Sequence, residues 1–95
     1  MRPTALVWFE GTLAEGYSYP ALDLGSPVPG MKDAMAKLSA THTIIIASVF
    51  ARTIPGRKRV HSWLMANGFS FAGLHDGPGL PPHDVRYDNA ALLLE

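Results

Sequence analysis

The feature that most constrains the fold is the run Thr43–Ala47, in which three consecutive isoleucines follow a threonine and no charged residue interrupts the apolar stretch. A strand with one face in water alternates apolar and polar residues, whereas a strand covered on both faces is apolar throughout. β-Branched residues also favour an extended backbone. The run therefore predicts a central strand of a parallel α/β sheet that is covered on both faces.

Helical and extended patterns alternate along the rest of the chain. Three further strands are predicted where apolar and β-prone residues gather: residues 4–9, 69–74 and 85–87. Helices are predicted where apolar residues repeat at helical spacing between a proline-containing start and a polar or glycine stop: residues 31–40 and 55–67, with a terminal helical turn at 90–94. The alternation predicts right-handed crossovers between parallel strands.

These patterns predict one α/β domain over residues 1–95. We expect a minimal three-layer parallel sheet of about four strands with helices on both faces. In open parallel sheets, ligands bind beyond the carboxyl ends of the strands. Candidate site residues are therefore sought where each strand ends.

Residues 11–30 form a long segment with four glycines and three prolines. Because proline is poorly tolerated inside regular elements, the segment is predicted to be a loop. Loops of this length are uncommon in compact domains and usually have a function. Tyr17 and Tyr19 are its candidate partner-binding aromatics.

The charge balance excludes some classes of partner. Eight Lys and Arg residues balance eight Asp and Glu residues, and the resulting net charge of zero argues against nucleic-acid binding. One basic cluster is either a solvated face or a contact for phosphate-bearing or acidic partners: Arg52, Arg57, Lys58 and Arg59. No apolar run is long enough to span a membrane. The absence of cysteine fits a cytoplasmic protein, and the neutral, apolar-rich composition predicts an oligomer or a protein partner.

Five segments in succession carry short motifs. Residues 6–13, Leu-Val-Trp-Phe-Glu-Gly-Thr-Leu, resemble the first motif of the haloacid dehalogenase-like (HAD) phosphohydrolases, an apolar strand followed by Asp-x-Asp-Gly-Thr-Leu. Residues 44–48 are similar to the second motif of that family, an apolar strand that ends in Ser or Thr. Segments 27–35, 59–68 and 79–90 resemble the two helix regions and the Pro-Pro-x-Asp-Val stretch of small HAD-like proteins. The resemblance covers nearly the whole chain and implies the strand order 4-1-2-3.

The matched positions depart from the family where its chemistry is concentrated. Trp8 stands at the position of the nucleophilic and magnesium-binding aspartate. An indole can neither attack phosphorus nor ligate a hard cation. Glu10 matches the general acid/base, and Leu80 replaces the lysine that balances phosphate charge. The resemblance thus implies a site without nucleophile and without cation.

The remaining matched positions keep only part of the family's pattern. Ser48 retains the hydroxyl of the second motif, and the closing acid pair is reduced to Asp88 followed by Asn89. We therefore expect no catalytic residue, no cofactor and no metal; Asp88 would be the ligand if Mg²⁺ bound at all. Each position also has a structural interpretation: Trp8 as packing at a strand end, Glu10 as a loop acid bonded to backbone N–H groups, and Ser48 as a cap for the following turn.

The leading hypothesis is a catalytically inactive HAD-like domain that binds a protein partner or associates with itself. Such small proteins resemble those of phage and bacterial genomes, which suggests a phage accessory or host-interference role. The alternative is a residual Mg²⁺-dependent phosphatase, or a phosphate-ester-binding protein, that uses Glu10, Ser48 and Asp88. A hydrolytic triad of Ser48, His75 and Asp88 is also conceivable, since all three are predicted at one sheet edge.

Overall fold

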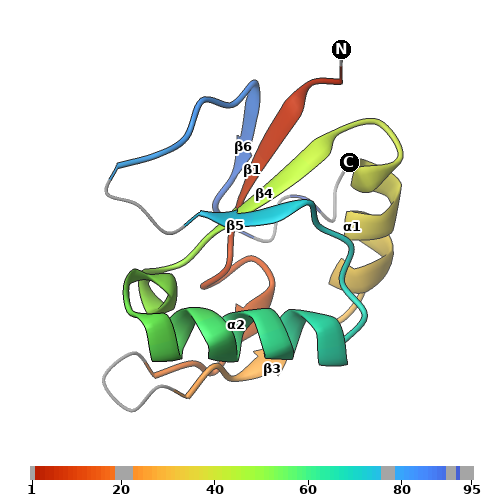
Figure 1. Cartoon of the computed structure of the whole chain (residues 1–95). Coiled ribbons are helices and arrows are strands. Elements are labelled where there is room, and N and C mark those ends of the chain that lie inside the picture. The colour runs from red at the N-terminus through yellow and green to blue at the C-terminus, as the bar shows by residue number, and fades with distance from the viewer. Residues whose placement is uncertain (1, 19–22, 76–78, 90–91, 93–95) are drawn as a thin grey trace.

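Four parallel strands form the main sheet of the computed structural model, which describes residues 2–18, 23–75, 79–89 and 92 (Figure 1). The strands follow the order β5-β4-β1-β6. Their bounds are β1 Thr4–Trp8, β4 Thr43–Ala47, β5 Gly73–His75 and β6 Val85–Tyr87. The predicted α/β fold with a parallel sheet of four strands is confirmed, and so is the strand order that the resemblance implied.

Two α-helices connect the strands, and each starts where the sequence predicts. Helix α1 spans Met31–Ser39 and follows Gly30, whose φ of 83° suits glycine. Helix α2 spans Ile54–Ala66, with Pro55 in its first turn. Its N-cap is Thr53, whose side chain accepts a hydrogen bond from the backbone N–H of Gly56 at 3.1 Å. A short 3₁₀ helix, η1, spans Val49–Arg52 between β4 and α2.

Helices were expected on both faces of the main sheet, but the two described α-helices lie on the same face, because successive right-handed crossovers that run in one direction across a sheet stay on one side of it. On one face, residues such as Val7 and Ile46 share one buried cluster with side chains of both helices, among them Met35 and Leu64. Side chains alternate between the faces of a strand, so Trp8, Ala47, His75 and Arg86 belong to the opposite face. Among the described residues, the connection that includes Leu80 lies over this second face at the carboxyl ends of the strands.

The long loop contains a small hairpin that the sequence did not predict. Strands β2 (Ala14–Glu15) and β3 (Ser26–Pro27) pair antiparallel, with Ala14 opposite Pro27. The expectation that Pro27 lies outside regular structure was wrong, because an edge position leaves the missing N–H of proline without consequence. The indole N–H of Trp63 donates to the carbonyl of Gly25 at 3.1 Å, which ties the hairpin to α2.

The third predicted strand is shorter than expected and begins later. Residues 69–72 do not belong to β5. Phe69 packs in the hydrophobic core instead of continuing the strand. Its N–H donates to the carbonyl of Leu64, and its ring stacks on Trp63 with centroids 5.6 Å apart. The predicted terminal turn at 90–94 lies outside the described residues apart from Leu92, which is buried.

Over the described part of the chain, no helix combines the length and the apolar composition needed to cross a membrane.

Candidate functional site

A cavity of about 310 Å³ lies at the carboxyl edge of the main sheet, on the face opposite the helices. Eight described residues line it: Trp8, Ala47, Ser48, Arg52, His75, Gly79, Leu80 and Arg86. Its position is the one predicted for ligand binding in open parallel sheets. The size suits a small ligand rather than a protein segment.

The cavity brings together several of the positions that the HAD-like resemblance singled out. Trp8, Ser48 and Leu80 all line it, although they are far apart in the sequence. Glu10 joins them through a hydrogen bond from the Ser48 hydroxyl. Asp88 and Asn89 are exposed and do not line the cavity.

The sequence did not single out Arg86, although it contributes a positive charge to the cavity. Its position in the strand predicted at 85–87 would have been enough to place Arg86 on the cavity side of the sheet. Neighbouring residues of a strand point to opposite faces, so Val85 and Tyr87 face the helices and Arg86 faces the cavity. The sheet pairing confirms that Arg86 lies beside Leu6 on β1.

Glu10 is buried next to Ser48, and its carboxylate forms hydrogen bonds within the protein. One carboxylate oxygen accepts hydrogen bonds from the Ser48 hydroxyl and from the backbone N–H of Val49, the latter at 3.2 Å. Its other oxygen, Oε2, and the Thr12 hydroxyl are buried without a hydrogen-bond partner among the described residues. The carboxylate therefore fastens the turn after β1 to the turn after β4, as the structural interpretation of Glu10 predicted.

Ser48 acts as the predicted cap. Its hydroxyl oxygen accepts a hydrogen bond from the backbone N–H of Phe50 at 3.1 Å, at the start of η1. The same hydroxyl donates to Glu10, so both of its hydrogen-bonding functions serve the fold. Ser48 thus holds in place the turn that carries Arg52 to the cavity.

Replacing Ser48 with alanine should lower the free energy of unfolding by about 1–2 kcal/mol, because one cap and one buried hydrogen bond are lost together. Urea unfolding followed by tryptophan fluorescence measures the change. Ser62→Ala is the matched control, since Ser62 is an exposed residue of α2 and its loss should change stability by less than about 0.5 kcal/mol. Equal effects of the two substitutions would contradict the capping role.

The geometry does not suit the magnesium ion that HAD-like chemistry requires. The described residues contain no group of three Asp, Glu, His or Cys side chains able to hold a metal. Asp88 forms an ion pair with Arg86, with Nε and Oδ2 3.3 Å apart. In Glu10, Oε1 accepts hydrogen bonds from Ser48 and Val49, which leaves a single buried oxygen, Oε2. A hard cation needs several converging oxygens, and these residues do not provide them.

The hydrolytic triad considered from the sequence is not formed. The Ser48 hydroxyl donates to Glu10 instead of His75. A ring nitrogen of His75, Nε2, lies 3.0 Å from the carbonyl oxygen of Gly79, and Asp88 pairs with Arg86. The strand ends bring the three residues to one edge of the sheet, but their side chains bond elsewhere.

The candidate partner-binding residues lie in three places. Tyr17 is exposed on the hairpin, and Tyr19 falls outside the described residues. Arg52 lines the carboxyl-edge cavity. The other three members of the basic cluster lie side by side in the first turns of α2: Arg57, Lys58 and Arg59.

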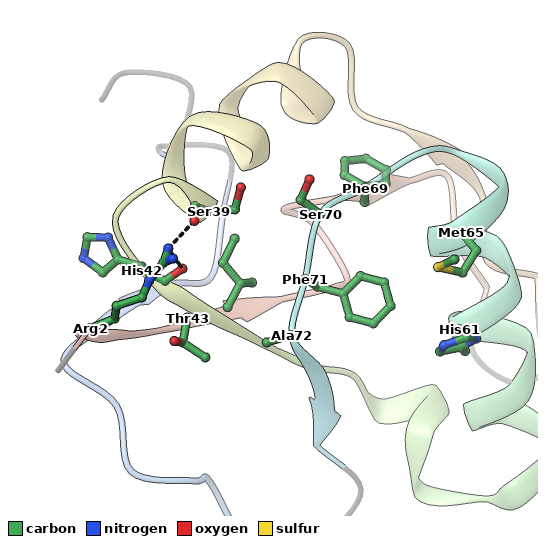
Figure 2. A pocket seen from close by; sticks show the side chains of 11 residues that line it. Arg2, Ser39, His42, Thr43, His61, Met65, Phe69, Ser70, Phe71 and Ala72 are labelled. Carbon is green, nitrogen blue, oxygen red and sulfur yellow. Dashed lines mark hydrogen bonds between the residues drawn. The ribbon is translucent and has the colours of Figure 1, made fainter.

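A second hollow, of about 500 Å³, lies at the amino-terminal edge of the sheet (Figure 2). Its wall includes His61 and Phe71, whose rings meet edge to face with centroids 5.8 Å apart. Arg2 lines it too, but its guanidinium donates to the carbonyls of Ser39 and His42, the latter at 3.0 Å. Arg2 therefore binds carbonyl groups at and just after the end of α1. Among the described residues that line the hollow, no other is a lysine or an arginine.

Comparison with known proteins supports the fold and leaves the activity open. No protein-family model matches the chain, and no curated protein matches it. A similar solved structure is that of a conserved protein coded by locus from Bacteroides thetaiotaomicron, with 25% sequence identity and a TM-score of 0.72. The match covers 93% of this chain and 76% of that one. The shared property is the α/β fold.

Proposed function

We propose that this protein is a non-hydrolytic binding protein of HAD-like architecture, and that the carboxyl-edge cavity holds a small anion such as a phosphate monoester. Arg52 and Arg86 line the cavity together with His75. None of the described lining residues is acidic. Guanidinium groups make strong charge-assisted hydrogen bonds to phosphate and carboxylate, so this lining favours an anionic ligand.

The observation that carries the proposal is the indole of Trp8 in the wall of the cavity. At the position where a phosphohydrolase needs an attacking carboxylate, it provides an apolar ring without nucleophilic character. The nearby carboxylate of Glu10 is buried and holds Ser48 and Val49. A bound phosphate ester would meet positive charge and a flat aromatic surface, but no group that could accept its phosphoryl group.

The charges around the cavity also suggest reversible binding. Arg86 is shared with Asp88, and both side chains are about half exposed, at 46% and 51%. Water and the carboxylate compete with any ligand for this guanidinium. Arg52 belongs to η1 and has no acidic partner among the described residues within ion-pair distance, so we expect it to contribute more of the binding free energy.

Two measurements test the proposal. With p-nitrophenyl phosphate and magnesium, we expect no release of nitrophenol above the blank. With phenyl phosphate, we expect saturable binding seen in the fluorescence of Trp8, measured in a Trp63→Phe background that removes the other tryptophan. Arg52→Met should weaken that binding roughly 10- to 100-fold, the effect of losing one charge-assisted hydrogen bond.

Arg59→Met is the matched control, because Arg59 is exposed on α2 and does not line the cavity. Its affinity for phenyl phosphate should equal that of the unmodified protein. Magnesium-dependent turnover that disappears in Asp88→Asn would overturn the proposal in favour of a residual phosphatase. Equal weakening by Arg52→Met and Arg59→Met would show that the anion binds by general charge attraction outside the cavity.

Protein binding or self-association is the second candidate function, and exposed apolar side chains favour it. Ile54 and Met65 on α2 are each 62% exposed, and Tyr17 and Leu80 are 43% exposed. Tyrosine and methionine are enriched at the centres of protein interfaces. Light scattering over a range of protein concentrations distinguishes a constant monomer mass from a mass that rises with association.

A further inference from the structure

The charges of this neutral protein are unevenly distributed along the chain. Residues 34–75 contain five of the eight Lys and Arg side chains and none of the eight Asp and Glu side chains. This segment contains β4, η1, α2 and β5. The net charge of zero therefore conceals a positive segment that includes α2. Among the described residues, Asp23 is the acid that shares a groove with Lys58 and Arg59, on the hairpin side of the helix.

A hollow of about 400 Å³ lies between α2 and β5 within this positive segment. Leu74 forms its apolar wall on the strand, and Arg57, Lys58, His61 and Ser62 line it from the helix. Arg57 is partly used by the fold, because its Nε donates to the carbonyl of Ala51 at 3.3 Å. Lys58 is exposed, and no acid of the described residues forms an ion pair with it.

The strand beside this hollow is at the edge of the sheet. Within the described residues, β5 pairs with β4 on one side and has no strand on the other. In a parallel pair, alternate residues of an edge strand turn their peptide groups away from the neighbouring strand. The outer side of β5 therefore offers N–H and C=O groups to which another extended segment could pair.

We propose that the outer edge of β5 and the adjoining face of α2 bind an extended acidic segment of a partner protein, which adds as a strand beside β5. An apolar side chain of that segment enters the hollow beside Leu74. An acidic side chain two residues along lies on the same side of the added strand and reaches Lys58. The hollow shares no lining residue with the carboxyl-edge cavity, so the proposal does not depend on anion binding there.

The chemistry of the surface favours an acidic peptide over two other partners, a nucleic acid and a second copy of the chain. A nucleic acid would use the positive charge but would leave the edge of β5 and the apolar hollow unused. A second copy of the chain could offer its other edge strand, β6, but Arg86 at the centre of that strand would bring a further positive charge. An acidic strand complements both the charge and the open edge.

The test uses short fluorescein-labelled peptides as probes. In the first peptide, valine and glutamate take turns at every second position and threonine fills the positions between them, so that valine and glutamate lie on the same side of an extended strand. The second has lysine in place of glutamate. The third has the sequence of the first but carries N-methyl groups on its valine and glutamate amides, which removes the hydrogen bonds of an added strand and keeps the charge. We expect saturable binding of the first peptide by fluorescence anisotropy and at least tenfold weaker binding of the other two.

Protein variants locate the binding surface. Lys58→Glu reverses a charge beside the hollow and should weaken binding of the valine–glutamate peptide at least tenfold. Lys32→Glu is the control, because Lys32 is an exposed lysine on α1, and it should leave the affinity unchanged. In amide NMR spectra, the peptide should shift signals of β5 and α2. Binding of phenyl phosphate should be unchanged in Lys58→Glu, which separates this test from that of the cavity.

Several results would overturn the proposal. Equal binding of the N-methylated peptide would show that the surface recognises charge alone. Tighter binding of a labelled single-stranded oligonucleotide, lost in Lys58→Glu, would assign the face to nucleic acid. A dimer detected by light scattering and dissociated by Lys58→Glu would assign it to a second copy. Shifts confined to Leu24 and Gly25 would place the peptide in the groove on the hairpin side of α2, where Lys58 also contributes.

Discussion

Replacing Phe9 with alanine is expected to lower the free energy of unfolding by about 3–5 kcal/mol, the usual range for removing a buried aromatic ring. Phe9 is fully buried, and its ring meets Trp63 and Phe50 edge to face, with centroids 4.9 and 6.2 Å away. A domain of this size has a total stability of roughly 5–14 kcal/mol. The variant should therefore lose between about one fifth and all of its free energy of unfolding, which urea unfolding at several temperatures will measure.

The effect of Phe9→Ala should extend to the candidate site. The carbonyl of Phe9 accepts hydrogen bonds from the N–H groups of Leu13 and Ala14, at 3.0 and 3.1 Å. The ring thus anchors the turn that carries Glu10. Phe9→Leu, which leaves a smaller void, is the control and should cost about 1.5 kcal/mol or less. A loss below about 1.5 kcal/mol for the alanine variant would contradict the central position of this ring.

Gly56→Ala, at the single glycine of α2, is expected to lower the free energy of unfolding by about 3 kcal/mol or more. A Cβ atom at this position would lie 1.9 Å from the carbonyl oxygen of Phe50 and 2.9 Å from the capping oxygen of Thr53. The first contact is with backbone, which no side-chain rotation can relieve. Helix α2 and η1 would have to move apart, which would displace Arg52 of η1.

Gly73→Ala on β5 provides the matched comparison for this prediction. A Cβ atom there would meet only the Cδ1 atom of Ile45, at 3.5 Å, which is an ordinary contact. We expect this variant to unfold within about 1 kcal/mol of the unmodified protein. Thermal unfolding of both variants measures the difference. Similar melting temperatures would show that α2 and η1 are not packed as closely as the 1.9 Å contact requires.

The local elements were largely predictable, because they depend on neighbours in the sequence. The apolar spacing of Met31, Met35 and Leu38 predicted α1, and Pro55 predicted the first turn of α2. The isoleucine run predicted β4 with its bounds. The hairpin β2–β3 was not predictable in this way, because its strands are only two residues long and depend on the Trp63 contact to Gly25.

The site was predictable in position but not in its bonding. Because parallel strands end at one edge, Trp8, Ser48 and His75 were expected near one another, and all three line the cavity. The sequence could not show that Glu10 and Ser48 are bonded to each other, or that Asp88 pairs with Arg86. Each of these contacts depends on side-chain directions set by packing of segments distant in the chain.

The sequence by itself determined that this chain builds a parallel α/β sheet, since hydrophobic periodicity and backbone preferences act over a few neighbouring residues. It also determined that an indole, and no carboxylate, occupies position 8. Only the tertiary structure decided that Arg52 and Arg86 converge on one cavity and that the positive face of α2 borders the open edge of β5. Such convergence depends on which distant segments pack together, and short-range patterns carry no information on that.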